Sequence, residues 1–90
     1  MAIYVINHKV NDINAWKKIY DEFEATRQQF AVKEHYALQS VENINHVLVV
    51  GEGELEAIHK FLNSEDLKTG MAGAGIASPP EHLLAKIKFN

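Results

Sequence analysis

The spacing of hydrophobic residues along this chain switches several times between strand-like and helical patterns, and four short segments have the character of strands. Residues 2–10 are rich in Val, Ile and Tyr, and residues 33–41 alternate apolar and polar side chains. Residues 46–52 (HVLVVGE) are almost continuously apolar, as expected of a central strand, and the intervening ENIN makes the turn of a hairpin. Residues 81–89 alternate again, with one face formed by Leu83, Ala85, Ile87 and Phe89.

Helical spacing fills the two gaps between these strands. After Asn11 and Asp12, which suit a helix cap, the segment 13–30 carries an apolar stripe at intervals of three, four and seven residues. The stripe consists of Ile13, Trp16, Tyr20, Phe23 and Phe30.

A second helix is expected over residues 53–63, with Leu55, Ile58 and Leu62 directed inward. Ser64 then caps a further turn or two that end near Met71.

The resulting order, strand, helix, strand, strand, helix, strand, predicts the α+β class and a ferredoxin-like βαββαβ fold with a four-stranded antiparallel sheet. The first and last strands should be adjacent, with the hairpin beyond them. A length of 90 residues allows one domain, residues 1–90. Since IYVI and VLVV are apolar on both faces and the helices cover one, we expect a homodimer in which a second copy covers the other face.

Composition narrows the possible partners and the compartment. The net charge of −3 comes from interspersed acidic and basic residues without a Lys/Arg block, so nucleic acid is not expected as a partner. There is no cysteine for a disulfide or a thiolate site, and no cofactor is predicted. The N-terminal segment has neither a basic leader nor an apolar run long enough to span a membrane. The expectation is a cytoplasmic protein with no membrane partner.

The glycine-rich stretch GMAGAGIASPP (70–80) does not fit a phosphate-binding loop, because such a loop follows a strand and opens a helix. Here the glycines follow a helix and precede a strand. Gly70, Gly73 and Gly75 are therefore expected to end that helix in a left-handed conformation and to allow close backbone approach. Pro79 and Pro80 stiffen the entry to the last strand.

Three histidines are candidates for a site at one end of the sheet. The predicted topology places His8, His46 and His82 on three neighbouring strands, beside Asp12 and beneath the loop 70–80. Three imidazoles on one face could hold a metal ion. However, each strand has two faces and no HxH or HExxH spacing is present, so we predict no metal site and take the three as candidate ligand-binding residues, led by His8. His35 and His59 are expected at the surface.

Two further candidates lie in the first helical stripe. Trp16 is expected in the core, with one edge free to line a cavity. Arg27 is a guanidinium inside an apolar row and needs an anion, which is either a carboxylate across the dimer or the carboxylate of a ligand.

Three segments of the chain, VNDINAWKKIYDEFEATR, SVENINHVLVV and LEAIHKFLNSEDLKTGMAGAGIASPPE, resemble the small stand-alone proteins of the dimeric α/β-barrel superfamily. The resemblance implies two ferredoxin-like sheets that face each other, with pockets between sheet and helices. Relatives include cofactor-independent monooxygenases, haem-degrading enzymes, lactone isomerases, polyketide cyclases and many proteins of unknown function. Ala31 stands where the family pattern implies glycine, VGEGELEA lacks an aromatic that often closes the third strand, and of the haem-degrading set only Asn7 has a match.

Function is predicted at the level of class. We expect a homodimeric protein that binds a small organic molecule in a pocket between sheet and helices. A monooxygenase, isomerase or cyclase-type enzyme and a structural or regulatory dimer without ligand stay open as alternatives, so the sequence does not decide whether the chain is an enzyme. Hydrolase and dehydrogenase functions lack their Ser/His/Asp set and nucleotide fingerprint.

Overall fold

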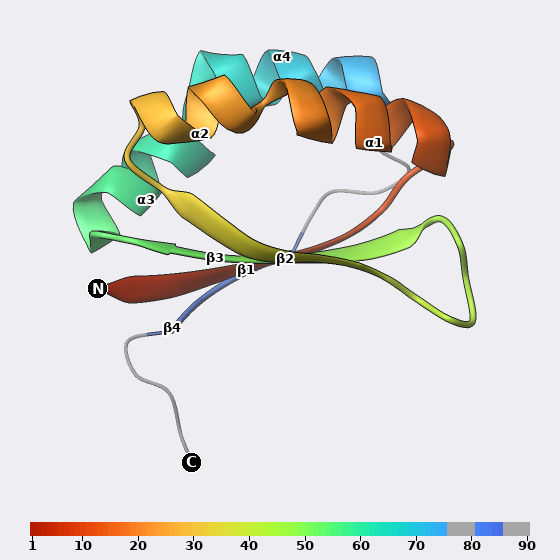
Figure 1. Cartoon of the computed structure of the whole chain (residues 1–90), viewed down its shortest axis with the longest axis horizontal. Coiled ribbons are helices and arrows are strands. Elements are labelled where there is room, and N and C mark those ends of the chain that lie inside the picture. The colour runs from red at the N-terminus through yellow and green to blue at the C-terminus, as the bar shows by residue number, and fades with distance from the viewer. Residues whose placement is uncertain (76–80, 86–90) are drawn as a thin grey trace.

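The protein has two layers, a sheet and a set of helices that covers one of its faces (Figure 1). The computed structural model describes residues 1–75 and 81–85, with the side chains of Ala74 and His82 excepted. The elements in chain order are β1 (Ala2–Lys9), α1 (Ile13–Glu22), α2 (Glu24–Gln29), β2 (Lys33–Gln39), β3 (His46–Gly53), α3 (Leu55–Leu62), α4 (Glu65–Ala74) and β4 (Glu81–Ala85). None of the described helices is long and apolar enough to cross a membrane.

The sheet confirms the predicted topology. Its order is β2-β3-β1-β4 and all three pairings are antiparallel, so the first and last strands are neighbours and the hairpin lies beyond them. The described part of the last strand ends at Ala85, and the remainder of the predicted strand, with Ile87 and Phe89, lies outside the described residues. Pro79 and Pro80 lie outside them too.

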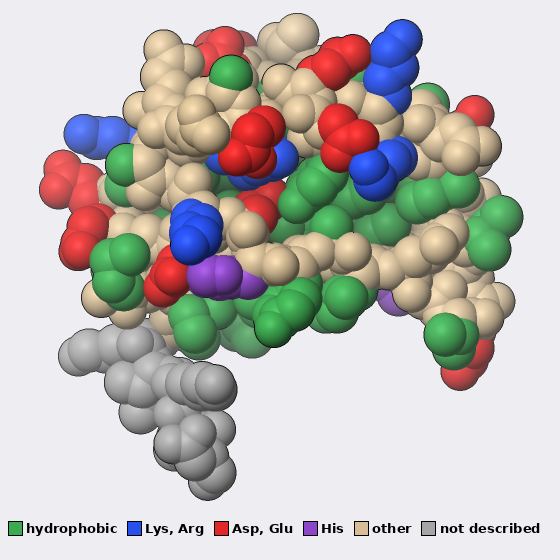
Figure 2. Space-filling view, in the orientation of Figure 1, with side chains coloured by type: hydrophobic (Ala, Val, Ile, Leu, Met, Phe, Trp, Pro, Cys, Tyr) green, Lys and Arg blue, Asp and Glu red, His purple; other side chains and the backbone are tan. Residues whose placement is uncertain are grey.

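Side chains alternate strictly along β1 and β3. Tyr4 and Ile6 of β1 face the helices together with Val47 and Val49 of β3, and all four are buried. The intervening apolar residues, which include Val5, point to the other face and are only half-buried. Figure 2 shows hydrophobic side chains gathered below the sheet, on the side away from the helices.

The strand β2 carries a β-bulge that changes its alternation. Glu34 pairs with Gly51 and Tyr36 pairs with Val50, so His35 is an extra residue between them. A regular strand would place Glu34 and Tyr36 on one face. Because of the bulge, the Glu34 side chain is buried under the helices at 7% exposure, whereas Tyr36 is 61% exposed on the open face.

The first helical segment differs from the single helix expected over 13–30. It begins as predicted, with the Asp12 carboxylate accepting hydrogen bonds from the backbone N–H groups of Asn14 and Ala15. It divides at Phe23, where ψ is −2° and the N–H is shared between the carbonyls of Ile19 and Tyr20. This tighter turn occurs where the Phe23 ring packs against Gly70 of α4, a long-range contact that periodicity does not reveal.

The helix α3 confirms Ile58 as an inward residue, adds Phe61, and differs from the expectation at Leu55. Ile58 and Phe61 are the buried residues, Leu62 is half-buried and Leu55 is 51% exposed. Leu55 is the first residue of the helix and lies at the margin of the layer, so the inward stripe begins one turn later.

The helix α4 is longer than the one or two turns expected. Ser64 accepts a hydrogen bond from the Leu67 N–H at its start, and the helix continues past Met71 to Ala74. Gly75 ends it in the left-handed conformation, as predicted, with φ of 70°, whereas the same expectation is wrong for Gly70 and Gly73, which lie inside the helix. Gly70 lies inside the helix and allows the expected close approach, because a Cβ there would lie 2.4 Å from the Phe23 ring.

Two small residues elsewhere also shape the layers. Ala31, where glycine was expected, has φ of 59°, which costs an alanine about 1 kcal/mol. Gly51 leaves room for the ring of Tyr4, its partner on β1, since a Cβ would approach the ring to within 2.4 Å.

The two interior glycines of α4 give opposite predictions for the same substitution. Gly73→Ala should raise the free energy of unfolding by about 0.5–1 kcal/mol, because alanine favours a helix and nothing lies within 4 Å of the added Cβ. Gly70→Ala should lower it by about 1 kcal/mol or more, because the Cβ collides with Phe23. Urea denaturation of both variants checks this. Equal stabilisation by both would show that α4 does not pack on Phe23.

Candidate functional site

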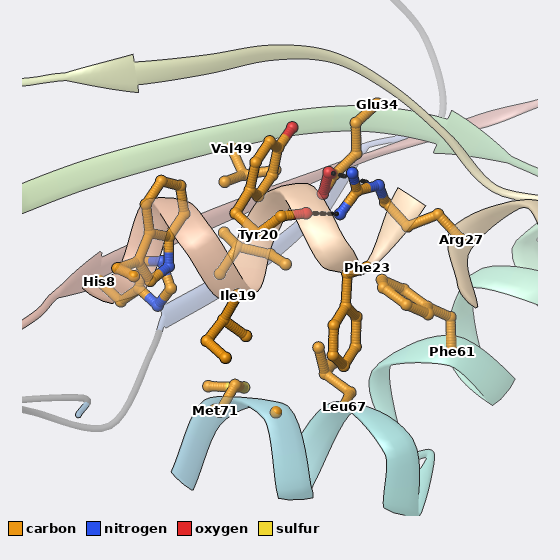
Figure 3. Close-up of a pocket in the computed structure, with 13 residues that line it drawn as sticks. His8, Ile19, Tyr20, Phe23, Arg27, Glu34, Val49, Phe61, Leu67 and Met71 are labelled. Carbon is orange, nitrogen blue, oxygen red and sulfur yellow. Dashed lines mark hydrogen bonds and ion pairs between the residues drawn. The ribbon is translucent and has the colours of Figure 1, made fainter. Parts of the chain in front are cut away.

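A cavity of about 60 Å³, open on one side to solvent, lies between the helices and the sheet. Among the described residues, every element except β4 contributes to its walls. The sheet supplies Ile6, His8, Glu34 and Val49, the segment α1–α2 supplies Trp16, Ile19, Tyr20, Phe23 and Arg27, and α3–α4 supply Phe61, Leu67, Gly70 and Met71. Polar groups occur at its two ends, with apolar side chains between them (Figure 3).

At one end, aromatic rings form a continuous row. The His8 ring meets Trp16 edge-on at 5.7 Å between centroids, and Trp16 stacks on Tyr20 at 4.9 Å. Both His8 and Trp16 are 7% exposed. Trp16 is thus a core residue that also lines a cavity, as the sequence suggested.

At the other end, Arg27 is buried and each of its three guanidinium nitrogens has a partner. Nη1 donates to the Tyr20 carbonyl at 3.0 Å, Nη2 bonds to the Glu24 carboxylate at 3.1 Å, and Nε lies 3.3 Å from Oε2 of Glu34. Its Cζ also lies 4.4 Å from the centre of the Tyr20 ring. The carboxylates that pair with Arg27 therefore belong to its own chain. The expectation that a second copy supplies this carboxylate is wrong.

Glu34 is the site residue that the sequence analysis missed. Its side chain is 7% exposed and faces Arg27 across the gap between β2 and α2. Burial raises the pKa of Glu34, and the Arg27 charge and the nearby hydroxyls of Tyr20 and Tyr4 only partly oppose that rise. An arginine within an apolar helical stripe, followed by a glutamate in the next strand, could have indicated a buried ion pair. The bulge at His35, however, hid the face to which Glu34 points.

The two tyrosines near Glu34 are affected in turn. Burial, followed by the negative charge of Glu34, raises the pKa of both Tyr4 and Tyr20 well above the usual range, so both hydroxyls stay protonated and can donate. The Tyr4 ring lies against Gly51, in space that the Cβ of any other residue would occupy.

The three candidate histidines do not form one cluster. His8 faces the helices, whereas His46 lies on the opposite face, where its Nε2 is 2.5 Å from Oδ1 of Asn7. His82 pairs with Ile6 in the sheet register, but its side chain lies outside the described part of the structure. Residues 76–80 of the loop 70–80, which was expected to cover the histidines, lie outside it too.

Within the described residues there is no group of three or more His, Cys, Asp or Glu side chains that could hold a metal ion. His35 and His59 are exposed, as expected, and His35 pairs with Glu52 at 2.7 Å. Of the five candidates, the structure brings together His8, Trp16 and Arg27 and adds Glu34.

A second hollow lies outside Trp16, between α1 and the edge strand β2. It measures about 310 Å³ and is lined by Ile13, Trp16, Lys17, Ala37, Leu38 and Val47, among others. Trp16 contributes to both spaces, so its indole separates the inner cavity from this outer groove.

No protein-family model and no curated protein sequence matches this chain. Solved structures match over almost their full length. SnoaB, a cofactor-independent oxygenase from Streptomyces nogalater, has a TM-score of 0.77 at 14% identity over 99% of this chain and 94% of that one. A conserved protein from Methanosarcina mazei Go1 has a TM-score of 0.76 at 15% identity, covering 98% and 94%. A NIPSNAP domain protein from Burkholderia xenovorans has a TM-score of 0.70 at 7% identity, covering 98% and 95%.

These matches confirm the fold expected from the resemblance. The chain has the ferredoxin-like α+β fold, which the structural neighbours share. At such identities the likeness extends to the fold and not to activity.

The raised pKa of Glu34 predicts a specific pH dependence of stability. Below the ordinary value of 4.5 the carboxyl is protonated in both the folded and the unfolded chain. As the pH rises above 4.5, the unfolded chain releases this proton first, so the free energy of unfolding falls until the folded pKa is passed. Glu34→Gln should remove this fall, which has a limiting slope of about 1.4 kcal/mol per pH unit.

The measurement is urea denaturation of both proteins between pH 4 and 8. The charged and titratable groups that face Glu34, namely Arg27 and Glu24 on α2, Tyr20 on α1 and Tyr4 on β1, are the same in both. Parallel profiles for the two proteins would contradict the raised pKa.

Proposed function

We propose that this protein is a homodimer that binds a small organic molecule in the cavity between its sheet and its helices. The observation that carries the proposal is a largely apolar cavity with buried polar side chains, His8 at one end and Arg27 with Glu34 at the other. Binding pockets commonly combine apolar walls with a few fixed polar groups that orient the ligand. A cavity kept only by imperfect packing would not be expected to have a charged pair in its wall.

The size of the cavity limits what can bind without rearrangement. About 60 Å³ corresponds to roughly two water molecules and is below the 150 Å³ of a cavity known to take benzene. Without rearrangement the cavity therefore admits only part of a small ring or a short chain, and the rest of the ligand has to extend through the open side or displace Trp16 towards the outer groove.

The proposed dimer follows from the face of the sheet without helices. Val5 and Leu48 lie at its centre, and Tyr36, Leu38 and Leu83 are 61%, 49% and 62% exposed around them. A patch of this kind on a small protein marks an interaction site, and a second copy offers a self-complementary surface about a two-fold axis. Two polar pairs on this face, His46–Asn7 and His35–Glu52, can help to set the register of two sheets.

An enzyme of the oxygenase, isomerase or cyclase type is the second candidate. The observation that favours it is Glu34, since a carboxyl of raised pKa in an apolar wall is suited to take or give a proton. The likeness to SnoaB agrees with this candidate at the level of the fold.

The dimer predicts a change of mass when a charge is placed on the open face. The native protein should elute at twice the 10.1 kDa of the chain in size-exclusion chromatography with light scattering. Leu48→Asp should give the monomer mass at micromolar concentration, because the carboxylate would be buried in the interface. Ala25→Asp, on the exposed surface of α2, is the control and should stay dimeric. A monomeric native protein would refute this part of the proposal.

Ligand binding can be followed through Trp16, the only tryptophan of the chain and a wall of the cavity. Titration with 4-methylpyrazole, a small uncharged ring, should change its fluorescence to saturation, with a dissociation constant on the order of millimolar. Val49→Phe, which fills the cavity from the sheet, should abolish the change. Val50→Phe, on the opposite face, should preserve it. A signal that does not saturate, or one unaffected by Val49→Phe, would favour a structural dimer without ligand.

A further inference from the structure

We propose that Glu34 is the hydrogen-bond acceptor for the ligand, and that the cavity takes uncharged organic molecules with an N–H or O–H donor and rejects anions. This inference rests on the function proposed above, because it assigns the ligand class of the same cavity.

Arg27 offers little attraction to an anionic ligand. Its guanidinium nitrogens already contact two carboxylates and one carbonyl oxygen, at distances between 3.0 and 3.3 Å. One positive charge is thus compensated by Glu34 and Glu24, and the Tyr20 ring covers one side of the guanidinium. A ligand carboxylate would have to displace one of these partners and would meet the charge of the other. The sequence-based hypothesis that Arg27 holds a ligand carboxylate is replaced by one in which Arg27 positions Glu34.

Glu34 has capacity left to accept a hydrogen bond. A carboxylate offers about four lone-pair positions, and its neighbours here are the Arg27 Nε and the hydroxyls of Tyr20 and Tyr4. The contact with Nε is an ion pair without the alignment of a hydrogen bond, and Oε2 is a buried atom that no described residue bonds with good geometry. Buried acceptors are normally satisfied, and Glu34 is a lining residue of the cavity, so a ligand donor can complete the hydrogen bonding of this carboxylate.

The rest of the cavity selects for a compact apolar body. Between Glu34 and His8 the wall consists mainly of aliphatic and aromatic side chains, among them Ile19, Phe23 and Met71. A donor group on a small ring could point towards Glu34 while the ring lies against these side chains. Charged groups on the ring would lose their hydration without gaining a free partner.

Three pyrazoles test the ligand class with Trp16 fluorescence as the readout. 4-Methylpyrazole has a ring N–H, its isomer 1-methylpyrazole has none, and pyrazole-4-carboxylate keeps the N–H but carries a negative charge. We expect 4-methylpyrazole to bind about tenfold more tightly than 1-methylpyrazole, as for a hydrogen bond to a charged acceptor. The carboxylate should give no saturable change over the same concentrations.

Variants then assign the selectivity to Glu34. Glu34→Gln should bring the affinities of the two isomers close to each other, while the matched control Glu52→Gln, on the open face, should leave their ratio unchanged.

If both isomers bind the native protein equally, or the carboxylate binds best, this inference fails and the proposed binding function stands. If the ratio survives in Glu34→Gln, the acceptor is another group and the assignment is wrong. If none of the three binds, the binding function fails. The comparison of isomers needs only the native protein, so it holds even if Glu34→Gln does not fold.

Discussion

The alternation of side chains across a sheet that has helices on only one face governs the chemistry of this protein. Every strand residue points either into the space under the helices or onto the bare face. His8 therefore lies in the cavity and His46 outside it, although the two are close in the sheet register. The same rule leaves Val5 and Leu48 on the face that we propose is covered by a second copy.

Within the covered space, the pair of Arg27 and Glu34 connects the helical layer to the edge strand β2. Both side chains are almost fully buried, and removal of one member of such a pair typically costs about 3 kcal/mol or more. Well-packed apolar residues in these two positions would often be as stabilising as the ion pair. Stability alone therefore does not explain why the pair is present, and we look for a role in function. Its position in the wall of a cavity, with Tyr20 and Tyr4 beside it, suits the orientation of a ligand.

Local patterns were sufficient for much of the fold. Strand and helix order, the cap at Asp12 and the left-handed end at Gly75 all depend on residues that are close in sequence. The break at Phe23 was not predictable in this way, because it accompanies a contact with Gly70, which lies far along the chain. The exposed position of Leu55 likewise follows from where α3 meets the sheet and not from its own periodicity.

For the site, the sequence by itself determined the residue types available: an aromatic stripe with Trp16, an arginine in that stripe that must find an anion, and strands apolar on both faces. Only the tertiary structure decided which of these residues meet. The bulge at His35 reverses the alternation of β2 and turns Glu34 inward to Arg27, and the register of β1 with β3 separates His8 from His46. The physical reason is that a side chain's face depends on pairing with other strands, which is a property of the assembled sheet.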